Sequence, residues 1–375
     1  MHDIIVQLAD LRARGTACAL ASLVESSGSI PMSDRAKMVI PAEGQVLGTI
    51  GGGCLEAEIL AVGHEVLERG TPRSTRYTMT EQQAGEYGLN CGGTVHIFTE
   101  LVDPRSHAEA DPPDVFSAIA AAKETREACA LATRLGGDGS AGDVSRLLFV
   151  GGRRIGGLAS SDALEAVVAD VLQQERPRLM LMSADGSVRD CHRSDALSDS
   201  DQQIFLEPFA PPPMLYVFGG GHVGGPICDL AAHVGFHVVV VDDRPMFASR
   251  ERHPRANDCL IEEIETAFQR IPVDHQTYII AASRGHQHDE VIIEQAIRTP
   301  VRYIGMLGSE RKKLVLWKRI IERGGDPQRL EEVYAPIGAN IGADNPEEIA
   351  VAVLAELIQV RRANAKIWKT KRQVA

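Results

Sequence analysis

The sequence predicts an α/β protein: a C-terminal Rossmann-like parallel-sheet domain, preceded by an N-terminal α+β domain built from two related repeats. Three observations predict this class. Strands alternate with helices beyond residue 214, a glycine motif follows the first of these strands, and a segment of the first half recurs about 110 residues later. We therefore expect domains at 1–207 and 214–375, with repeats at about 1–100 and 113–207.

Length and charge limit the classes of function. The 375 residues are enough for two domains, and a chain that is 44% hydrophobic and 24% charged can form an ordinary globular core. The formal net charge of −12 gives a surface that repels phosphate backbones and anionic lipids. We expect neither nucleic acid nor a membrane among the partners.

Seven cysteines are scattered along the chain without a paired spacing, and no C-x-x-C motif occurs. This argues against a zinc ribbon and against a redox dithiol. The first residues, MHDIIVQLADLRARG, carry acids and bases where a signal peptide would be apolar, and the longest apolar runs are only strand-length. We expect reduced thiols in a cytoplasmic protein.

Two pairs of similar segments in the same order indicate an internal duplication. ACALASL at 17–23 reappears as ACALATR at 128–134, and the segment 46–73 resembles 154–178. Each copy is predicted to form a helix, two strands and a second helix, closed by a further strand. The copies differ just before the second helix, where the first has GGGC and the second has SSDA.

The GGGC segment is interpreted as functional, because a unit that needed these glycines only to fold should have kept them in both copies. It contains Gly51, Gly52, Gly53 and Cys54. Three glycines let a ligand approach the backbone closely, and the helix dipole favours the thiolate form of a cysteine at a helix N-terminus. Cys91, beside two glycines in LNCGGTVHIF, is a second candidate. The other five cysteines are expected to be buried or incidental.

The second domain begins after PFAPPPM at 208–214, where three consecutive prolines exclude both a helix and a central strand. Its alternating pattern predicts a parallel sheet covered on both faces. The strands are expected at LYVF, FHVVVVDD, 278–283 and 301–307, and the helices at 222–235, about 288–298, about 309–323 and 346–363.

The clearest predicted site is the glycine motif in YVFGGGHVGG. Gly219, Gly221 and Gly224 lie between a strand and a helix, which is the arrangement that brings backbone N–H groups and a helix N-terminus onto a pyrophosphate. His222 lies inside this loop, and Asp242 ends the next strand at a spacing that suits a ribose contact. The alternative is a domain that binds no dinucleotide and uses its glycines only for tight packing.

Two further loops are expected at the carboxyl ends of strands, where ligands of open parallel sheets collect. SRGHQHDE offers side chains for anion binding, proton transfer or metal ligation, although a clear third metal ligand is missing. These side chains are Arg284, His286, His288 and Asp289. GMLGSERKK offers Ser309, Arg311 and Lys312 to an anion; a capped helix with a solvated basic face is the alternative.

The motifs together resemble the xanthine dehydrogenase accessory factor family (XdhC/CoxI), and the likeness covers nearly the whole chain. The segments that carry it occur in one order: GTIGGGCLEAE, the Cys-Gly-Gly segment, PPPMLYVFGGGHVG, VVVVDDRPMFA, SRGHQHD, YIGMLGSERKK and PIGANIGADNPEEIAVAV. No general dehydrogenase has the GGGC half or the last of these segments. Some relatives have a cysteine just before CGG, where this chain has Asn90, so a role for a Cys–Cys pair is not expected to transfer.

This resemblance implies a cofactor-binding chaperone more than a catalyst. It implies a maturation factor that binds molybdenum cofactor, as molybdopterin or its dinucleotide form, supports its sulfuration and delivers it. The implied partners are an apo molybdenum hydroxylase of the xanthine dehydrogenase, aldehyde oxidoreductase or CO dehydrogenase type, a cysteine desulfurase-type sulfur donor, and a second copy in a homodimer. No catalytic residue and no metal-ligand set is assigned.

We expect the cofactor to bridge the two halves. Its phosphate end is placed at Gly219–Gly224 and its metal end towards Cys54 and Cys91, across a crevice between the domains, because thiolates suit sulfur-rich molybdenum. One alternative is an NAD(P)-dependent oxidoreductase whose first half binds substrate, with His286 and Asp289 as the nearest acid–base candidates. Another is a scaffold that only docks a sulfur donor and an apo-enzyme.

Overall fold

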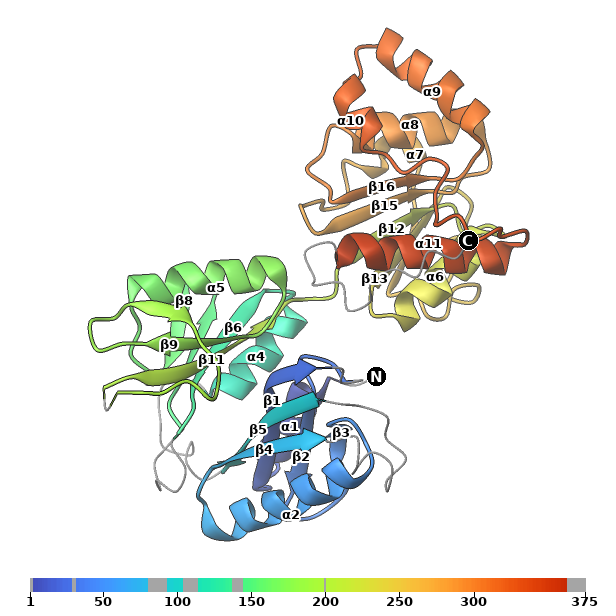
Figure 1. The fold of residues 1–375 in the computed structure, drawn as a ribbon. Helices are drawn as coiled ribbons and strands as arrows, with labels where there is room; N and C mark the ends of the chain where they lie inside the picture. The colour runs from blue at the N-terminus through green and yellow to red at the C-terminus, as the bar shows by residue number, and fades with distance from the viewer. Residues whose placement is uncertain are drawn as a thin grey trace. The chain divides into compact units, whose positions relative to one another are not determined.

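The computed structural model describes residues 3–28, 32–79, 93–103, 114–136, 144–198 and 200–362. The chain divides into two compact units, Met1–Pro211 and Pro212–Ala375 (Figure 1). None of the helices in these described ranges combines the length and apolar character needed to cross a bilayer.

The first unit begins with a five-stranded antiparallel sheet and two helices. The elements are α1 (Ile4–Ala13), β1 (Cys18–Gly28), β2 (Lys37–Pro41), β3 (Leu47–Thr49), α2 (Cys54–Arg69), β4 (Arg73–Met79) and β5 (Gly93–Val102). The strand order is β3-β2-β1-β5-β4. The long last strand, β5, pairs with the whole of β1 and completes the sheet.

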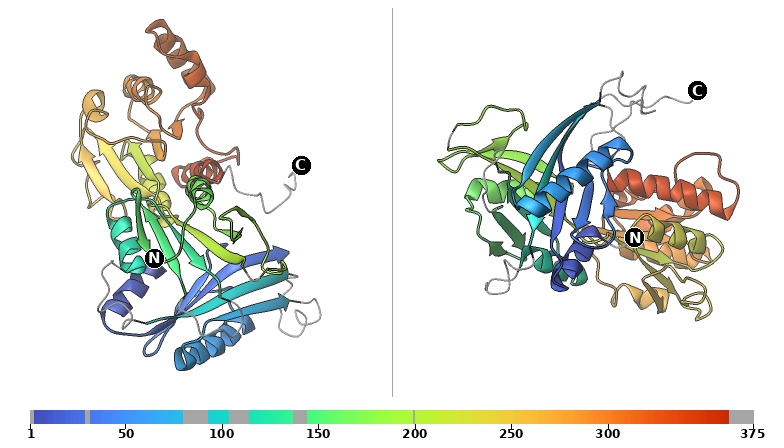
Figure 2. Two further views of the ribbon diagram at one scale, coloured as in Figure 1. Left: turned by 90° about the vertical axis from the view of Figure 1, so that its left-hand side faces the viewer. Right: turned by 90° about the horizontal axis from the view of Figure 1, so that it is seen from below.

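The second half of this unit follows the same path. It consists of α4 (Val115–Glu124), β6 (Cys129–Arg134), β7 (Arg146–Val150), β8 (Arg153–Gly156), α5 (Asp162–Gln174), β9 (Arg178–Met182), β10 (Val188–Asp190) and β11 (Gln202–Phe209). The order β8-β7-β6-β11-β9 reproduces the first sheet, and β10 is added at one edge. The predicted pair of α+β repeats is confirmed, and the two sheets can be followed by colour in Figure 2.

The two repeats share one core. Leu8 of α1 and Leu20 of β1 belong to the same buried cluster as Phe116 of α4 and Leu131 of β6. Two ion pairs also join the sheets. The carboxylate of Glu207 on β11 lies 2.6 Å from the ammonium of Lys37 on β2, and Arg146 of β7 pairs with Glu100 of β5.

The second unit has the predicted parallel sheet, with strand order β14-β13-β12-β15-β16. The strands are β12 (Met214–Phe218), β13 (His237–Asp242), β14 (Asp258–Ile261), β15 (Thr277–Ala281) and β16 (Tyr303–Met306). The chain starts in the middle of the sheet, goes to one edge and then crosses to the other. All strand pairs are parallel. This is a Rossmann-like order, and the fold class is confirmed.

Helices cover both faces of this sheet (Figure 1). They are α6 (Gly224–His233), α7 (Ile264–Ala267), α8 (His286–Ala296), α9 (Glu310–Glu322), α10 (Pro327–Glu331) and α11 (Pro346–Arg361). Two separate buried clusters result. One joins the sheet to α7, α8 and α9 through residues such as Ile293 and Leu316. The other joins it to α6 and α11 through residues such as Ile227 and Val353. The strand ends that carry the predicted loops therefore sit on a rigid frame.

Candidate functional site

The glycine loop joins the end of β12 to the start of α6, as the motif predicts. Two of its motif glycines are required by packing. A Cβ at Gly219 would overlap the carbonyl oxygen of Ala282, and one at Gly224 would overlap the carbonyl oxygen of Gly219. Gly220, between them, is equally confined, because a Cβ there would overlap the carbonyl oxygen of Phe247. For these three positions the packing interpretation of the glycines is sufficient.

Gly221 is different. A Cβ at this position would meet no described atom within 4 Å, so the packing of the described residues does not require a glycine here. A ligand that approaches the backbone closely would require one. His222, the next residue, has an exposed side chain. The loop thus has one glycine and one histidine available to a ligand beside the N-terminus of α6, where backbone N–H groups suit an anion.

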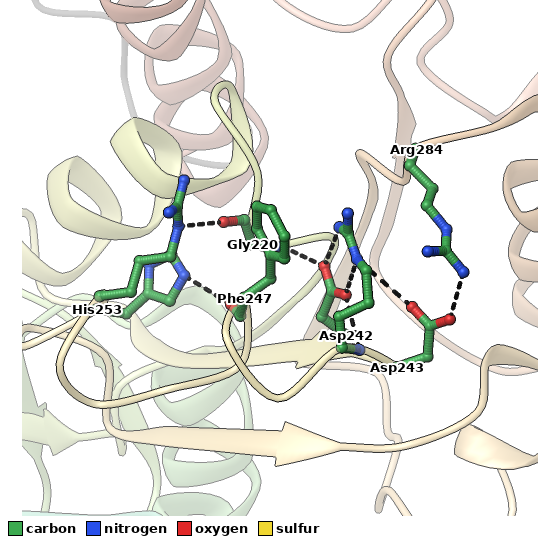
Figure 3. A network of polar contacts seen from close by, with 8 residues as sticks. Gly220, Asp242, Asp243, Phe247, His253 and Arg284 are labelled. Carbon is green, nitrogen blue, oxygen red and sulfur yellow. Dashed lines mark hydrogen bonds and ion pairs between the residues drawn. The ribbon is translucent and has the colours of Figure 1, made fainter.

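Asp242, the last residue of β13, is engaged by neighbouring groups. Its buried carboxylate accepts hydrogen bonds from the Gly220 N–H at 3.0 Å and from the Arg244 N–H at 3.1 Å. The Arg244 side chain adds two more, from Nε at 2.8 Å and from Nη2 at 2.9 Å (Figure 3). The ribose contact expected of Asp242 would therefore have to displace Arg244.

The segment after β13 wraps around the glycine loop. Arg252 Nε donates to the carbonyl oxygen of Gly220 at 2.9 Å, and a ring nitrogen of His253 lies 2.9 Å from the carbonyl oxygen of Phe247. The guanidinium carbons of Arg244 and Arg252 lie 3.7 Å and 4.7 Å from the centroid of the Phe247 ring. The sequence interpretation missed these residues. The signal it contained was an arginine two positions after the acid that ends the strand.

Arg284 comes to the same edge of the sheet from the end of β15. Its Nη2 lies 2.6 Å from Oδ2 of Asp243, which follows Asp242 (Figure 3). Asp243 also lies 3.8 Å from Nε of Arg244. The structure thus brings together predicted residues from two strand ends, Asp242 and Arg284, with Arg244 between them in a network of ion pairs.

The SRGHQHDE segment was expected to be a loop that leads into a helix at about residue 288. The helix α8 begins two residues earlier, at His286, so positions 286, 288 and 289 all lie in its first turns. Residues two positions apart on a helix do not face each other, which does not suit joint binding of one ion. Within the described ranges, no group of three His, Cys, Asp or Glu side chains could hold a metal.

Asp289, which is buried, and Lys312, which is half-buried, form a pair that the sequence interpretation did not find. The Lys312 ammonium contacts Oδ2 of Asp289 and donates to the carbonyl oxygen of Leu307 at 2.9 Å. The Ser283 hydroxyl donates to Oδ1 of Asp289 at 2.6 Å. Ser309 caps α9, as the capped-helix alternative predicts, by accepting from the Lys312 N–H at 3.3 Å.

The GGGC segment forms a turn at the N-terminus of α2. Gly51, Gly52 and Gly53 have φ angles of 88°, 77° and 68°, which only glycine adopts readily. In the second repeat, Ser161 caps α5 by accepting from Leu164 N–H, whereas among the described residues no side chain caps α2. The shared topology therefore does not require the three-glycine turn, which supports a function for it.

Cys54 is the first residue of α2, and its side chain is exposed. Glu56 holds the turn beside it. One oxygen of this carboxylate accepts from the N–H groups of Ile50 and Gly52, each at 3.2 Å, and contacts the Thr49 hydroxyl. The sequence interpretation did not single out Glu56, although the residue stands two positions after the cysteine. Cys91 lies outside the described residues.

The other described cysteines are poor nucleophiles. Cys18, Cys129, Cys191 and Cys228 are buried, and Cys259 is half-buried. Burial raises the pKa of Cys18, Cys129 and Cys191 to about 11 and raises that of Cys228 further. Thiolate is the reactive and metal-binding form. Among the described cysteines, Cys54 is therefore the one with an exposed side chain.

Comparison with known families matches both units. A model of the XdhC Rossmann domain matches residues 215–357, and a model of the XdhC and CoxI family matches residues 11–78. The chain belongs to the XdhC and CoxI family. The first match contains the glycine loop, Asp242 and the strand-end residues, and the second contains the GGGC turn. Both candidate sites therefore lie in segments that the family models match.

Individual relatives align along most of the chain. One, from Bacillus subtilis (strain 168), is a probable subunit of xanthine dehydrogenase, 26% identical over 355 residues, which are 93% of this chain and 94% of the relative. Another is the molybdenum cofactor insertion chaperone PaoD of Escherichia coli (strain K12), 20% identical over 347 residues, with 92% and 84% covered. Both alignments thus join the two units in one protein.

A solved structure has the same fold. It is described as a xanthine dehydrogenase from Bacillus halodurans, and it superposes with a TM-score of 0.74 over 98% of each chain at 21% identity. The fold of this chain is thus found in an experimental structure.

Proposed function

We propose that this chain is a maturation factor that binds molybdenum cofactor and delivers it to a molybdenum hydroxylase. Membership of the XdhC and CoxI family and similarity to a molybdenum cofactor insertion chaperone support the proposal. The structural observation that carries it is Gly221, which faces open space at the N-terminus of α6. This is where a phosphate group could approach the backbone.

The described residues fit the chemistry of this cofactor, a pterin that carries a phosphate tail and a dithiolene for molybdenum. The loop from Gly219 to Gly224 would hold the phosphate, with His222 and Arg284 nearby. Cys54 offers an accessible sulfur to the metal end, because soft ligands suit sulfur-rich molybdenum. When bound, the cofactor supplies the metal centre of the hydroxylase that receives it; the chain binds it and shields it.

We further propose that Cys54 and Cys91 take part in cofactor binding, and that the chain supports sulfuration of the cofactor with a cysteine desulfurase as the sulfur donor. The uncapped N-terminus of α2 and the three-glycine turn support a ligand beside Cys54, because neither is needed by the equivalent helix α5. A homodimer and a cytoplasmic location complete the proposal.

Delivery can be tested with purified components. The chain is loaded with molybdenum cofactor and a source of sulfide, mixed with an apo molybdenum hydroxylase, and the hydroxylase activity is followed. We expect activation by the wild type and by the control Cys259→Ser, and loss of activation with the double variant Cys54→Ser and Cys91→Ser. Full activation by the double variant would show that these cysteines have no role.

An NAD(P)-dependent oxidoreductase is the second candidate, and the Asp289–Lys312 pair favours it. This pair lies between the ends of β15 and β16, at the edge where ligands of such sheets bind, and could handle a proton. The change in nicotinamide absorbance on incubation with oxidisable substrates tests this candidate. A change that Lys312→Met abolishes would support it, and a constant absorbance would exclude it for those substrates.

A further inference from the structure

Asp242, the acid that ends β13, has no hydrogen-bond acceptor position left for ribose hydroxyls. A carboxylate has two oxygens and about four lone-pair positions. Asp242 receives hydrogen bonds from Gly220 N–H and from three donors of Arg244: its N–H, Nε and Nη2. In dinucleotide-binding domains an acid near this position binds the ribose 2′-hydroxyl, whereas a nearby arginine accommodates a 2′-phosphate. This site is therefore arranged for an anion rather than for a diol.

Cations collect around the same point in an otherwise acidic chain. Residues 242–255 contain four arginines and three acids, while the whole chain has a net charge of −12. Arg244 and Arg252 both lie beside the ring of Phe247. Each is anchored through part of its guanidinium group, Arg244 to Asp242 and Arg252 to the Gly220 carbonyl oxygen. Anchored guanidinium groups lose little entropy when they bind a phosphate.

The anchors also place these cations next to the glycine loop. The N–H of Gly220 binds Asp242 and its carbonyl oxygen binds Arg252, so this residue is held from both sides. The open position at Gly221 directly follows it. The phosphate of a ligand on the loop would thus lie within reach of Arg244 and Arg252.

We infer that the carboxyl end of β13 binds a phosphate monoester, recognised by Arg244 with Arg252 as the second cation. This deepens the proposed function, because it concerns the tail of a ligand on the same loop. The shared chemistry has two sources: the terminal phosphate of a pterin cofactor, or the 2′-phosphate of an NADP-type nucleotide. A tail that ends in an unphosphorylated nucleoside lacks this group.

The first arm of the test measures the binding of NADP⁺ and NAD⁺ to the full chain by calorimetry, since the two differ only in the 2′-phosphate. A charge-assisted bidentate contact predicts NADP⁺ binding at least about tenfold tighter. Arg244→Ala should reduce the preference to within about twofold. Arg255→Ala removes the same charge from an exposed position of the same segment and should keep the preference.

The second arm measures retention of molybdenum cofactor on gel filtration, with a phosphate monoester tail and with a dinucleotide tail. Arg244→Ala should lower retention of the monoester form and leave the dinucleotide form unchanged. Because Arg244→Ala also leaves buried Asp242 without its partner, Arg252→Ala serves as a second variant whose fold does not depend on that ion pair. Melting temperatures show whether each variant is folded.

The inference is supported if Arg244→Ala reduces either the preference for NADP⁺ or the retention of the monoester cofactor. The measurement that changes identifies the source of the phosphate. If NADP⁺ shows the preference and no pterin is retained, the anion site stands and the proposed function fails. The inference is overturned if NADP⁺ and NAD⁺ bind with equal affinity and pterin is retained equally with either tail, whether or not Arg244 and Arg252 are replaced. In that case the proposed function survives.

Discussion

Arg244 binds the carboxylate of Asp242 at two points, with Nε 2.8 Å from Oδ1 and Nη2 2.9 Å from Oδ2. Burial alone would raise the pKa of Asp242. The hydrogen bonds from the Arg244 side chain, from its backbone N–H and from Gly220 N–H outweigh burial, so the pKa is lowered. The ionised carboxylate therefore holds the loop after β13 against the glycine loop.

This ion pair predicts a loss of stability in acid. Because the pKa of Asp242 is lower in the folded than in the unfolded chain, its contribution is present above the unfolded pKa of about 3.9 and is lost as the pH falls through the folded value. Melting temperatures of the wild type and Asp242→Asn should differ at neutral pH and converge below about pH 4. A difference that stays constant into this acid range would contradict the assignment.

The glycines of the loop should separate into two classes. Gly224→Ala should lower the free energy of unfolding by about 1–3 kcal/mol, because its Cβ overlaps the carbonyl oxygen of Gly219. Gly221→Ala should leave the free energy of unfolding unchanged and weaken the binding of phosphate ligands. Urea unfolding followed by the fluorescence of Trp317, on α9 of the second unit, measures the first effect. Equal losses in the two variants would rule out an open Gly221.

The buried pair between the repeats should be costly to break. Lys37→Met leaves the carboxylate of Glu207 buried without its ammonium partner, which should cost about 3–5 kcal/mol. The double variant Lys37→Met and Glu207→Leu should recover much of this loss. The far-ultraviolet circular dichroism transition measures the loss. A double variant as unstable as Lys37→Met would show that the pair is not the cause.

Accessibility of the cysteines gives a direct chemical prediction. In the native protein, iodoacetamide should modify Cys54 well before Cys18, Cys129, Cys191 and Cys228, which are buried. Peptide mapping by mass spectrometry measures the order, and the urea-unfolded chain is the control in which all five react. Bound molybdenum cofactor should slow the modification of Cys54. Labelling of the buried cysteines at the same rate would contradict the described burial.

Much of the fold could be predicted because it depends on patterns that are local or repeated. Alternating strands and helices with a glycine loop after the first strand predict the parallel sheet, and the collinear segments predict the repeats. The short strands β3 and β8 were not predicted. They have three and four residues, and their pairing depends on the neighbouring strand rather than on their own periodicity.

The positions of the candidate-site residues along the backbone could be predicted from the sequence, whereas most of their side-chain contacts could not. Gly221 and Cys54 lie at helix N-termini, as their motifs indicate. The ion pair of Arg244 with Asp242 and the pair of Lys312 with Asp289 depend on how a loop folds back and on how two strand ends meet. Residue spacing does not determine either contact. The start of α8 at His286 was missed because Gly285, before it, resembles a loop residue.

The glycine loop of the second unit is proposed to hold molybdenum cofactor. The most direct measurement is gel filtration of the chain mixed with this cofactor, followed by pterin fluorescence and molybdenum content of the protein peak. Wild type and Val351→Asp, which adds a charge on an exposed position of α11, should retain both, and Gly221→Asp should retain neither. Retention by Gly221→Asp equal to that of the wild type, or no retention by the wild type, would contradict the claim.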